Sequence, residues 1–413
     1  MRRFTLCLGL LLGLSFSATS PTIYSFNDLW TMALSNNVGL RIQAEKVIQA
    51  NSDITLAKSA LAPAVDLGGS LRSSVTSSGL KPTAGLSLSA SLPLYDAGRL
   101  GSKVEASTLS KKMADIQAHT TLVDIGYSLK VQALELLRQV KLLDLNQLVV
   151  NRRQQQVDLV RLRYKAGLEN IGSVYTTEVN LTVSQEERKT ILRKINEQQE
   201  ALRAMAGLPA SAPFTVSLNT ATPTTLAPPS ETILSQHDRL TLKTISLEQA
   251  KLDLVAAQSS LAPKLSLSGG ADASQSLSTG TFDSSLSFGL SAQFSLFDGG
   301  ATLAQIQRST SIIREREQLL LQEKSTLQNE SLQAFNDLQD AISTRMTSQK
   351  YREANQERSI IGDKRYSTGF IDFDSWLLVE NELLQSEKNE LNAQINGAEA
   401  FAKWQQIQGG IAP

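Results

Sequence analysis

The chain has 413 residues, of which 41% are hydrophobic and only 5% aromatic, a lean composition for thick globular cores of that size. Its 40 basic and 40 acidic residues cancel, so no net charge would draw the protein to nucleic acid. We therefore expect thin or elongated packing, and we do not expect nucleic acid among the partners.

Residues 1–20 are predicted to be a secretory signal peptide. Arginines precede an apolar stretch from Phe4 to Leu14, and small residues follow as far as Ser20. The apolar stretch is shorter than the ~20 residues that a membrane helix needs. The only cysteine, Cys7, lies within this segment, so we expect neither a disulfide nor a thiolate site in the mature chain.

A first structural repeat is predicted over residues 21–207, with strands at about 64–76 and 84–95. Serines alternate in the second strand with apolar residues, namely Leu86, Leu88, Ala90, Leu92 and Leu94. A strand of about ten residues with one apolar face suits a transmembrane barrel and equally a half-buried soluble sheet, so both remain open. Since the smallest barrels have about eight strands, four strands per chain could span a membrane only if several chains shared one barrel.

A very long helix is predicted over about residues 101–164, because proline is absent from Leu94 to Leu208 and apolar residues recur at every seventh position. These positions are Leu122, Leu129, Leu136, Leu143, Val150, Val157 and Tyr164. At ~1.5 Å per residue the helix would be ~95 Å long, which is too long for a compact domain. A returning helix is predicted over about 171–206.

A proline-containing linker is predicted over residues 208–230, and a second structural repeat over 231–413. The second repeat is expected to contain strands at about 264–274 and 282–297, a long helix at about 301–366 and a returning helix at about 371–408. The second of these strands again alternates apolar residues with serines. Two repeats of this length indicate a duplicated half-protein rather than a solenoid.

A five-residue motif ends both predicted hairpins, with its copies 202 residues apart. It reads Leu-Tyr-Asp-Ala-Gly up to Gly98 and Leu-Phe-Asp-Gly-Gly up to Gly300. Asp96 and Asp298 can cap the start of the following helix, and glycine tolerates the bend between strand and helix. We therefore interpret these residues as turns from barrel to helix.

A second motif, Arg-Tyr-x-x-Gly, ends both predicted long helices with the same spacing of 202 residues. Its glycines, Gly167 and Gly369, are natural C-caps for a helix. In this order and with this double occurrence, the signal peptide, the helix–hairpin–helix unit and the two motifs resemble the TolC-type outer-membrane factor family. The resemblance covers nearly the whole mature chain.

The resemblance implies a mixed α and transmembrane β fold that forms a homotrimer. Three chains would contribute four strands each to a 12-stranded outer-membrane β-barrel surrounded by lipid, and a coiled-coil tunnel of helices would continue it into the periplasm. Proteins of this type are passive exit ducts that dock with a periplasmic adaptor and an inner-membrane transporter. No cofactor is implied.

The resemblance also implies a constriction at the helical tips. Asp372 and Asp374 are candidates for an acidic pore gate. The best-known aspartates of the family lie slightly further along, where this chain has Ser375 and Leu378 instead. The alternative is that Asp372 and Asp374 are solvated turn residues. Candidate latches between neighbouring helices are Arg163, Tyr164, Arg365 and Tyr366. Adaptor contact is expected at residues 168–176 and 370–377, near Gly167, Gly369, Val174 and Trp376.

Catalytic and metal chemistry are not expected. The two histidines, His119 and His237, are far apart in the pattern, and neither has ligand-type neighbours at suitable spacing. No phosphate-binding loop occurs, so a partner must supply energy.

Small-molecule efflux is favoured because little room is left for an elaborate equatorial domain. Type I protein secretion and a trimeric coiled-coil surface fibre or adhesin are the alternatives.

Overall fold

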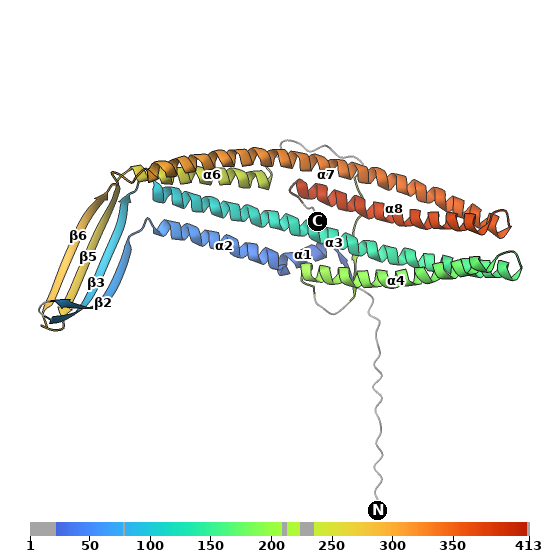
Figure 1. Ribbon diagram of the computed structural model, residues 1–413, viewed down its shortest axis with the longest axis horizontal. Helices are drawn as coiled ribbons and strands as arrows, with labels where there is room; N and C mark the ends of the chain where they lie inside the picture. The colour runs from blue at the N-terminus through green and yellow to red at the C-terminus, as the bar shows by residue number, and fades with distance from the viewer. Residues whose placement is uncertain (1–21, 77–78, 209–212, 224–234, 411–413) are drawn as a thin grey trace, which may run out of the picture. The chain divides into compact units, whose positions relative to one another are not determined.

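The computed structural model describes residues 22–76, 79–208, 213–223 and 235–410, so the predicted signal peptide and parts of the predicted linker lie outside the described residues. The first repeat contains β1 (Thr22–Ser25), α1 (Phe26–Asn36), α2 (Val38–Ser59), β2 (Ala64–Thr76), β3 (Gly79–Tyr95), α3 (Arg99–Lys165), α4 (Ile171–Ala206) and β4 (Phe214–Ser217). The second contains α6 (Asp238–Gln258), η1 (Ser259–Leu261), β5 (Lys264–Ser276), β6 (Phe282–Gln293), α7 (Ala301–Ser367) and α8 (Phe373–Ile407) (Figure 1).

The contacts within the chain define two compact units, and each unit contains parts of both repeats. Unit 1 consists of Met1–Ala33, Gln132–Asn219 and Asn355–Leu391, and unit 2 of Leu34–Val131, Thr220–Ala354 and Asn392–Pro413. The turns that end α3 and α7 therefore belong to unit 1, and the strands β2, β3, β5 and β6 belong to unit 2.

In unit 2 these strands form one antiparallel sheet in the order β2-β3-β5-β6 (Figure 1). The register aligns Leu67, Leu88, Ala271 and Leu286 across the four strands, so they share one face. The neighbouring row, which points to the opposite face, consists of Gly68, Ser87, Asp272 and Ser285. This register confirms the two-faced strands inferred from the alternating sequence.

The apolar face of the sheet is uncovered in the single chain. Leu67 is 70% exposed, Leu88 46% and Leu286 71%, and Phe288 reaches 80%. Several exposed apolar side chains in one row cannot be explained as isolated surface residues. The fold therefore leaves this face available to an apolar environment.

The strand boundaries differ most from the sequence prediction at two places. β3 begins at Gly79 instead of 84, because residues 79–83 continue the ladder opposite residues 72–76. β6 ends at Gln293 instead of 297, since its partner β5 begins at Lys264, directly opposite Gln293. The apolar Leu296 and Phe297 thus extend beyond the ladder and are 89% and 88% exposed.

In unit 1, the described part of the predicted linker forms a short strand that the sequence pattern did not indicate. β4 pairs in parallel with β1, aligning Thr22 with Phe214. The ring of Tyr24 lies edge-on to that of Phe214, with centroids 5.6 Å apart. The backbone carbonyl of Phe214 also accepts a hydrogen bond from the buried Gln199 of α4. This strand pair anchors the end of α4.

The long helices keep only part of the predicted seven-residue seam buried. Leu129, Leu136 and Val157 are at most 1% exposed, whereas Tyr164 at the end of α3 is 44% exposed. Both α3 and α7 contain 67 residues. None of the described helices has an apolar stretch long enough to cross a membrane.

Candidate functional site at the helical tips

The Arg-Tyr-x-x-Gly motif ends each long helix in a Schellman-type cap. Gly167 and Gly369 have φ angles of +73° and +83°, in the left-handed region that favours glycine. The N–H of Leu168 donates to the carbonyl of Arg163 at 2.9 Å, and the N–H of Phe370 donates to that of Arg365 at 2.8 Å. These bonds satisfy carbonyls that the helix leaves open. The repeated motif is thus a local chain reversal.

The second tip is built around the fully buried Tyr366, at the end of α7 in unit 1. Its ring stacks on Trp376 of α8 with a centroid distance of 4.3 Å and an interplanar angle of 7°. Phe373, Val160 of α3 and Val174 of α4 complete the buried cluster. Since the cluster combines side chains from both helical hairpins, the two tips share one core.

Polar contacts to Tyr366 also join the two hairpins. The guanidinium carbon of Arg163 lies 4.5 Å from the Tyr366 ring centroid, and Nη1 of Arg163 donates to the Tyr366 carbonyl at 2.7 Å. The Tyr366 hydroxyl donates to Glu169 Oε2 at 2.9 Å. Burial and then this carboxylate hold the pKa of Tyr366 well above its usual value, so the hydroxyl stays a donor.

Of the four candidate latches, only two contact each other in the structure. Arg163 and Tyr366, from different repeats, contact each other, whereas the side chains of Tyr164 and Arg365 are exposed. Glu169, which the sequence did not place among the latches, completes the contact. Glu169 and Tyr366 are 197 residues apart in the sequence, so no helical periodicity could have predicted their contact.

Val174 and Trp376 require a correction as candidate contact residues for an adaptor. They are only 5% and 1% exposed, because both side chains pack around Tyr366. The indole N–H of Trp376 is also used internally, as it donates to Asp363 Oδ1 at 2.7 Å. Apolar residues that are exposed near the tips are Leu168, Ile171, Tyr175, Val179 and Phe370.

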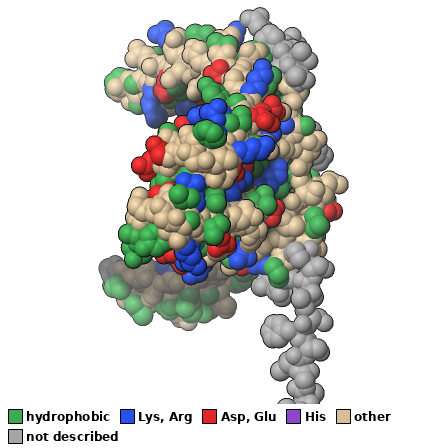
Figure 2. All heavy atoms as spheres, turned by 90° about the vertical axis from the view of Figure 1, so that its right-hand side faces the viewer, with side chains coloured by type: hydrophobic (Ala, Val, Ile, Leu, Met, Phe, Trp, Pro, Cys, Tyr) green, Lys and Arg blue, Asp and Glu red, His purple; other side chains and the backbone are tan. Residues whose placement is uncertain are grey.

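The two candidate gate aspartates lie at the start of α8. Oδ1 of Asp372 accepts a hydrogen bond from the backbone N–H of Ser375 at 2.7 Å. Hydrogen bonding from Ser375 lowers the pKa of Asp372. Asp374 follows in the first helical turn, and both residues are exposed. Figure 2 shows acidic and basic side chains interspersed on the face that it presents. Within one chain, Asp372 is therefore a helix cap.

A buried polar network below the tip was missed by the sequence interpretation. Glu380 of α8 is 2% exposed and accepts hydrogen bonds from the Ser359 hydroxyl of α7 and from Gln156 Nε2 of α3, the latter at 2.8 Å. The buried Arg153 donates to Gln156 Oε1 at 2.9 Å and to Asn381 Oδ1 at 2.6 Å. Each of these side chains makes at least one hydrogen bond, which offsets the free-energy cost of burying polar groups.

Burial is the main influence on Glu380. It raises the pKa of the carboxyl above its ordinary value, and Asp363 acts in the same direction. The hydrogen bond from Ser359 and the charges of Arg152 and Arg153 partly oppose this shift. In a helical sequence a buried glutamate cannot be distinguished from an exposed one, so only the packing shows that Glu380 is buried.

The turns from strand to helix, in unit 2, use the residues expected from the sequence. Asp96 Oδ2 accepts from the N–H of Leu100 at 2.7 Å, and Asp298 Oδ2 accepts from that of Thr302 at 2.8 Å. Gly98 and Gly300 have φ angles of +85° and +87°. Each aspartate thus lies two residues before a left-handed glycine and caps the first turn of a long helix.

The same fold occurs in solved outer-membrane channels. CusC shares 18% identity over 96% of each chain, with a TM-score of 0.85. VceC of Vibrio cholerae shares 19% identity over 93% of this chain and 96% of its own, with a TM-score of 0.77. CmeC of Campylobacter jejuni shares 15% over 93% and 85%, with a TM-score of 0.80. Among curated proteins, none matches the chain in sequence.

The fold is that of an outer-membrane channel protein, and the predicted duplicated unit of hairpin, long helix and returning helix is confirmed. The family model described as outer membrane efflux protein matches residues 29–208 and 230–410. The chain therefore belongs to the outer membrane efflux protein family, and the outer membrane is its location. At these low identities the solved structures establish the fold and leave the transported substrate undefined.

Proposed function

We propose that the chain forms the passive outer-membrane exit duct of a tripartite efflux system for small molecules. The observation that carries this proposal is the four-stranded sheet with its exposed apolar face. Within the described residues, β2 and β6 each pair with a single strand. Unpaired strand edges are not tolerated in lipid, so the edges require strands from further copies.

A homotrimer meets this requirement. Three copies of the four-stranded sheet would supply 12 strands, an even number within the range of known outer-membrane barrels. Outer-membrane lipid would cover the row that contains Leu67 and Leu286, and the row that contains Ser87 and Ser285 would face a wetted lumen. The helices would then extend the duct into the periplasm.

The tips would form the periplasmic entrance. In a trimer, Asp372 and Asp374 would bring six carboxylates toward one axis, where they would favour cations. The contacts of Arg163 and Glu169 with Tyr366 would hold the two helical hairpins of each chain together in the closed entrance. Opening would then require these contacts to separate.

The proposed partners are a periplasmic adaptor and an inner-membrane transporter, which would supply the energy. Exposed apolar residues near the tips favour adaptor docking there, and Ile171, Tyr175 and Val179 follow one another at four-residue intervals on α4. This stripe replaces Val174 and Trp376 in the proposed contact. The chain itself would act as a conduit and not as an enzyme.

Deletion and complementation of the gene test the proposal. We expect the deletion strain to accumulate small toxic compounds and to become more sensitive to them, while the proteins in its culture medium stay unchanged. Loss of one exported protein with unchanged drug sensitivity would instead support type I secretion. Membership of the efflux family gives no support to the surface-fibre alternative.

A further inference from the structure

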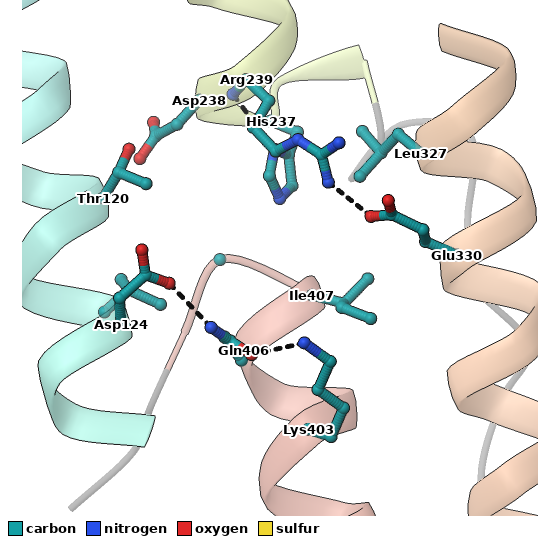
Figure 3. A pocket seen from close by; sticks show the side chains of 12 residues that line it. Thr120, Asp124, His237, Asp238, Arg239, Leu327, Glu330, Lys403, Gln406 and Ile407 are labelled. Carbon is teal, nitrogen blue, oxygen red and sulfur yellow. Dashed lines mark hydrogen bonds and ion pairs between the residues drawn. The ribbon is translucent and has the colours of Figure 1, made fainter. Parts of the chain in front are cut away.

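Both histidines of the sequence lie close to the N-terminus of α6, within unit 2, although His119 belongs to α3. Nδ1 of His119, in α3, lies 2.6 Å from Oδ2 of Asp238. His237 directly precedes α6 and lines a cavity of about 260 Å³ together with residues of α3, α7 and α8 (Figure 3). The fold thus brings together two residues that the sequence pattern had placed far apart. No metal-binding cluster occurs among the described residues.

The imidazole of His237 caps the start of α6. Its Nδ1 accepts a hydrogen bond from the backbone N–H of Arg239 at 3.2 Å, in the first turn of that helix. Since Nδ1 is the acceptor, the single proton of the neutral ring must be on Nε2. Only this neutral tautomer can accept the bond from Arg239. Ile407, the last residue of α8, lines the same cavity.

The charges nearest to His237 come from α6 and α7. Asp238 and Arg239 follow it in α6, and Arg239 is held by Glu323 at 2.7 Å and Glu330 at 2.5 Å, both in α7. Burial and then Arg239 lower the pKa of His237 below its ordinary 6.5, whereas Asp238, the Ile407 carbonyl and Glu323 act in the opposite direction.

Two further helices contribute charged groups to the cavity. Asp124 of α3 accepts from Gln406 Nε2 at 2.7 Å, and Lys403 of α8 donates to Gln406 Oε1 at 2.9 Å. Asp124 and Lys403 thus share one neutral partner and carry opposite charges (Figure 3). The exposed His119 contributes a titratable group from α3 through its contact with Asp238.

We propose that His237 is an acid-sensitive clasp, which holds the first turn of α6 while neutral and releases it when protonated. A protonated Nδ1 would direct a hydrogen at the N–H of Arg239 and could no longer accept from it. The added positive charge would also lie at a helix N-terminus, where the helix dipole disfavours it. Because α6 leads through η1 into β5, the clasp lies on the segment that enters the sheet.

The sign of the effect follows from the lowered pKa. The stabilisation by neutral His237 is complete above pH 6.5 and is lost as the pH falls from 6.5 through the lower pKa of the folded protein. In that interval, opening of the first turn should become up to ~10-fold more favourable per pH unit.

Hydrogen–deuterium exchange of the full-length protein in detergent tests the clasp. Protection factors, which correct for the intrinsic pH dependence of exchange, should be compared at about pH 7.5 and about pH 5.5. We expect the acid sample to lose protection at Arg239, Leu240 and Thr241 in α6. The informative variant is His237→Asn, since asparagine can cap a helix and does not titrate. It should stay protected at both pH values.

His119→Asn is the matched control, because it removes the other histidine and should keep the acid-induced loss of protection. A loss in His237→Asn equal to that of the original protein would overturn the proposal, and so would a lack of any loss in the original protein. If His237→Asn is unprotected at both pH values, His237→Asp supplies another capping acceptor. Acid-induced opening in that variant as well would then decide against the clasp.

Discussion

At the helical tips the chain covers its large apolar side chains within itself, whereas the four-stranded sheet leaves an apolar face and two edges to be covered from outside. Tyr366 is fully buried and has both its ring and its hydroxyl engaged, but Leu286 of the sheet is 71% exposed. The difference shows that the two regions depend on different surroundings. The tip buries its core within one chain, whereas the proposed trimer in lipid would cover the face and edges of the sheet.

The largest effect is expected from a charge on the apolar face of the sheet. Leu88→Arg or Leu290→Arg should cost ~2–4 kcal/mol per site, repeated in every copy, because each places a guanidinium in the lipid layer. Assembly should fail, as measured by the yield of heat-modifiable trimers in the outer-membrane fraction. Ser87→Arg is the matched control on the opposite face and should assemble. Normal trimer yield from both leucine variants would refute the assignment of the faces.

The next effect tests whether the tip is self-contained. Tyr366→Ala should cost ~3–5 kcal/mol, because it removes a buried ring from the shared core. Tyr164→Ala, at the same position of the motif in the first repeat, should change the stability by ~0.5 kcal/mol or less. Thermal unfolding and protease cleavage near the tips would measure both. A large loss in Tyr164→Ala would show that the exposed tyrosine is covered in the assembled protein, and the contrast with the sheet would weaken.

A smaller, pH-dependent effect is expected at Glu380. Since burial raises the pKa of this carboxyl in the folded protein above its ordinary 4.5, its contribution to stability is greatest at low pH and is lost as the pH rises through the folded value. Glu380→Gln should remove this dependence. The midpoint of thermal unfolding, compared between variant and original protein across the acid and neutral range, measures it. A constant difference at all pH values would assign Glu380 a purely steric role.

The smallest effect on stability is expected from the double variant Asp372→Asn and Asp374→Asn, because asparagine can replace Asp372 as a helix cap. Its effect should appear in conduction instead. Trimers in planar bilayers should lose cation selectivity and block by trivalent cations added from the periplasmic side. Asp340→Asn, an exposed change on α7, should do neither. Unchanged selectivity in the double variant would move the constriction elsewhere, first toward Glu169 and Glu178.

The sequence by itself determined the features that depend on local periodicity. The alternation around Leu88 defined a two-faced strand, and the repeated Arg-Tyr-x-x-Gly motif defined two helix ends, which the structure describes as left-handed caps at Gly167 and Gly369. Asp96 and Asp298 cap the long helices because a capping residue acts within one turn. Each of these patterns involves residues close in sequence, so the amino acids alone specify them.

Only the tertiary structure decided which distant residues meet. Arg163 contacts Tyr366 of the other repeat, and the exposed Tyr164 is left out although its motif is identical. The burial of Glu380 and the meeting of His119 with Asp238 were equally hidden. The physical reason is that side-chain contacts between helices depend on how the helices pack and rotate against one another. A helical sequence fixes its own period, but leaves the choice of facing partner to the packing of the whole chain.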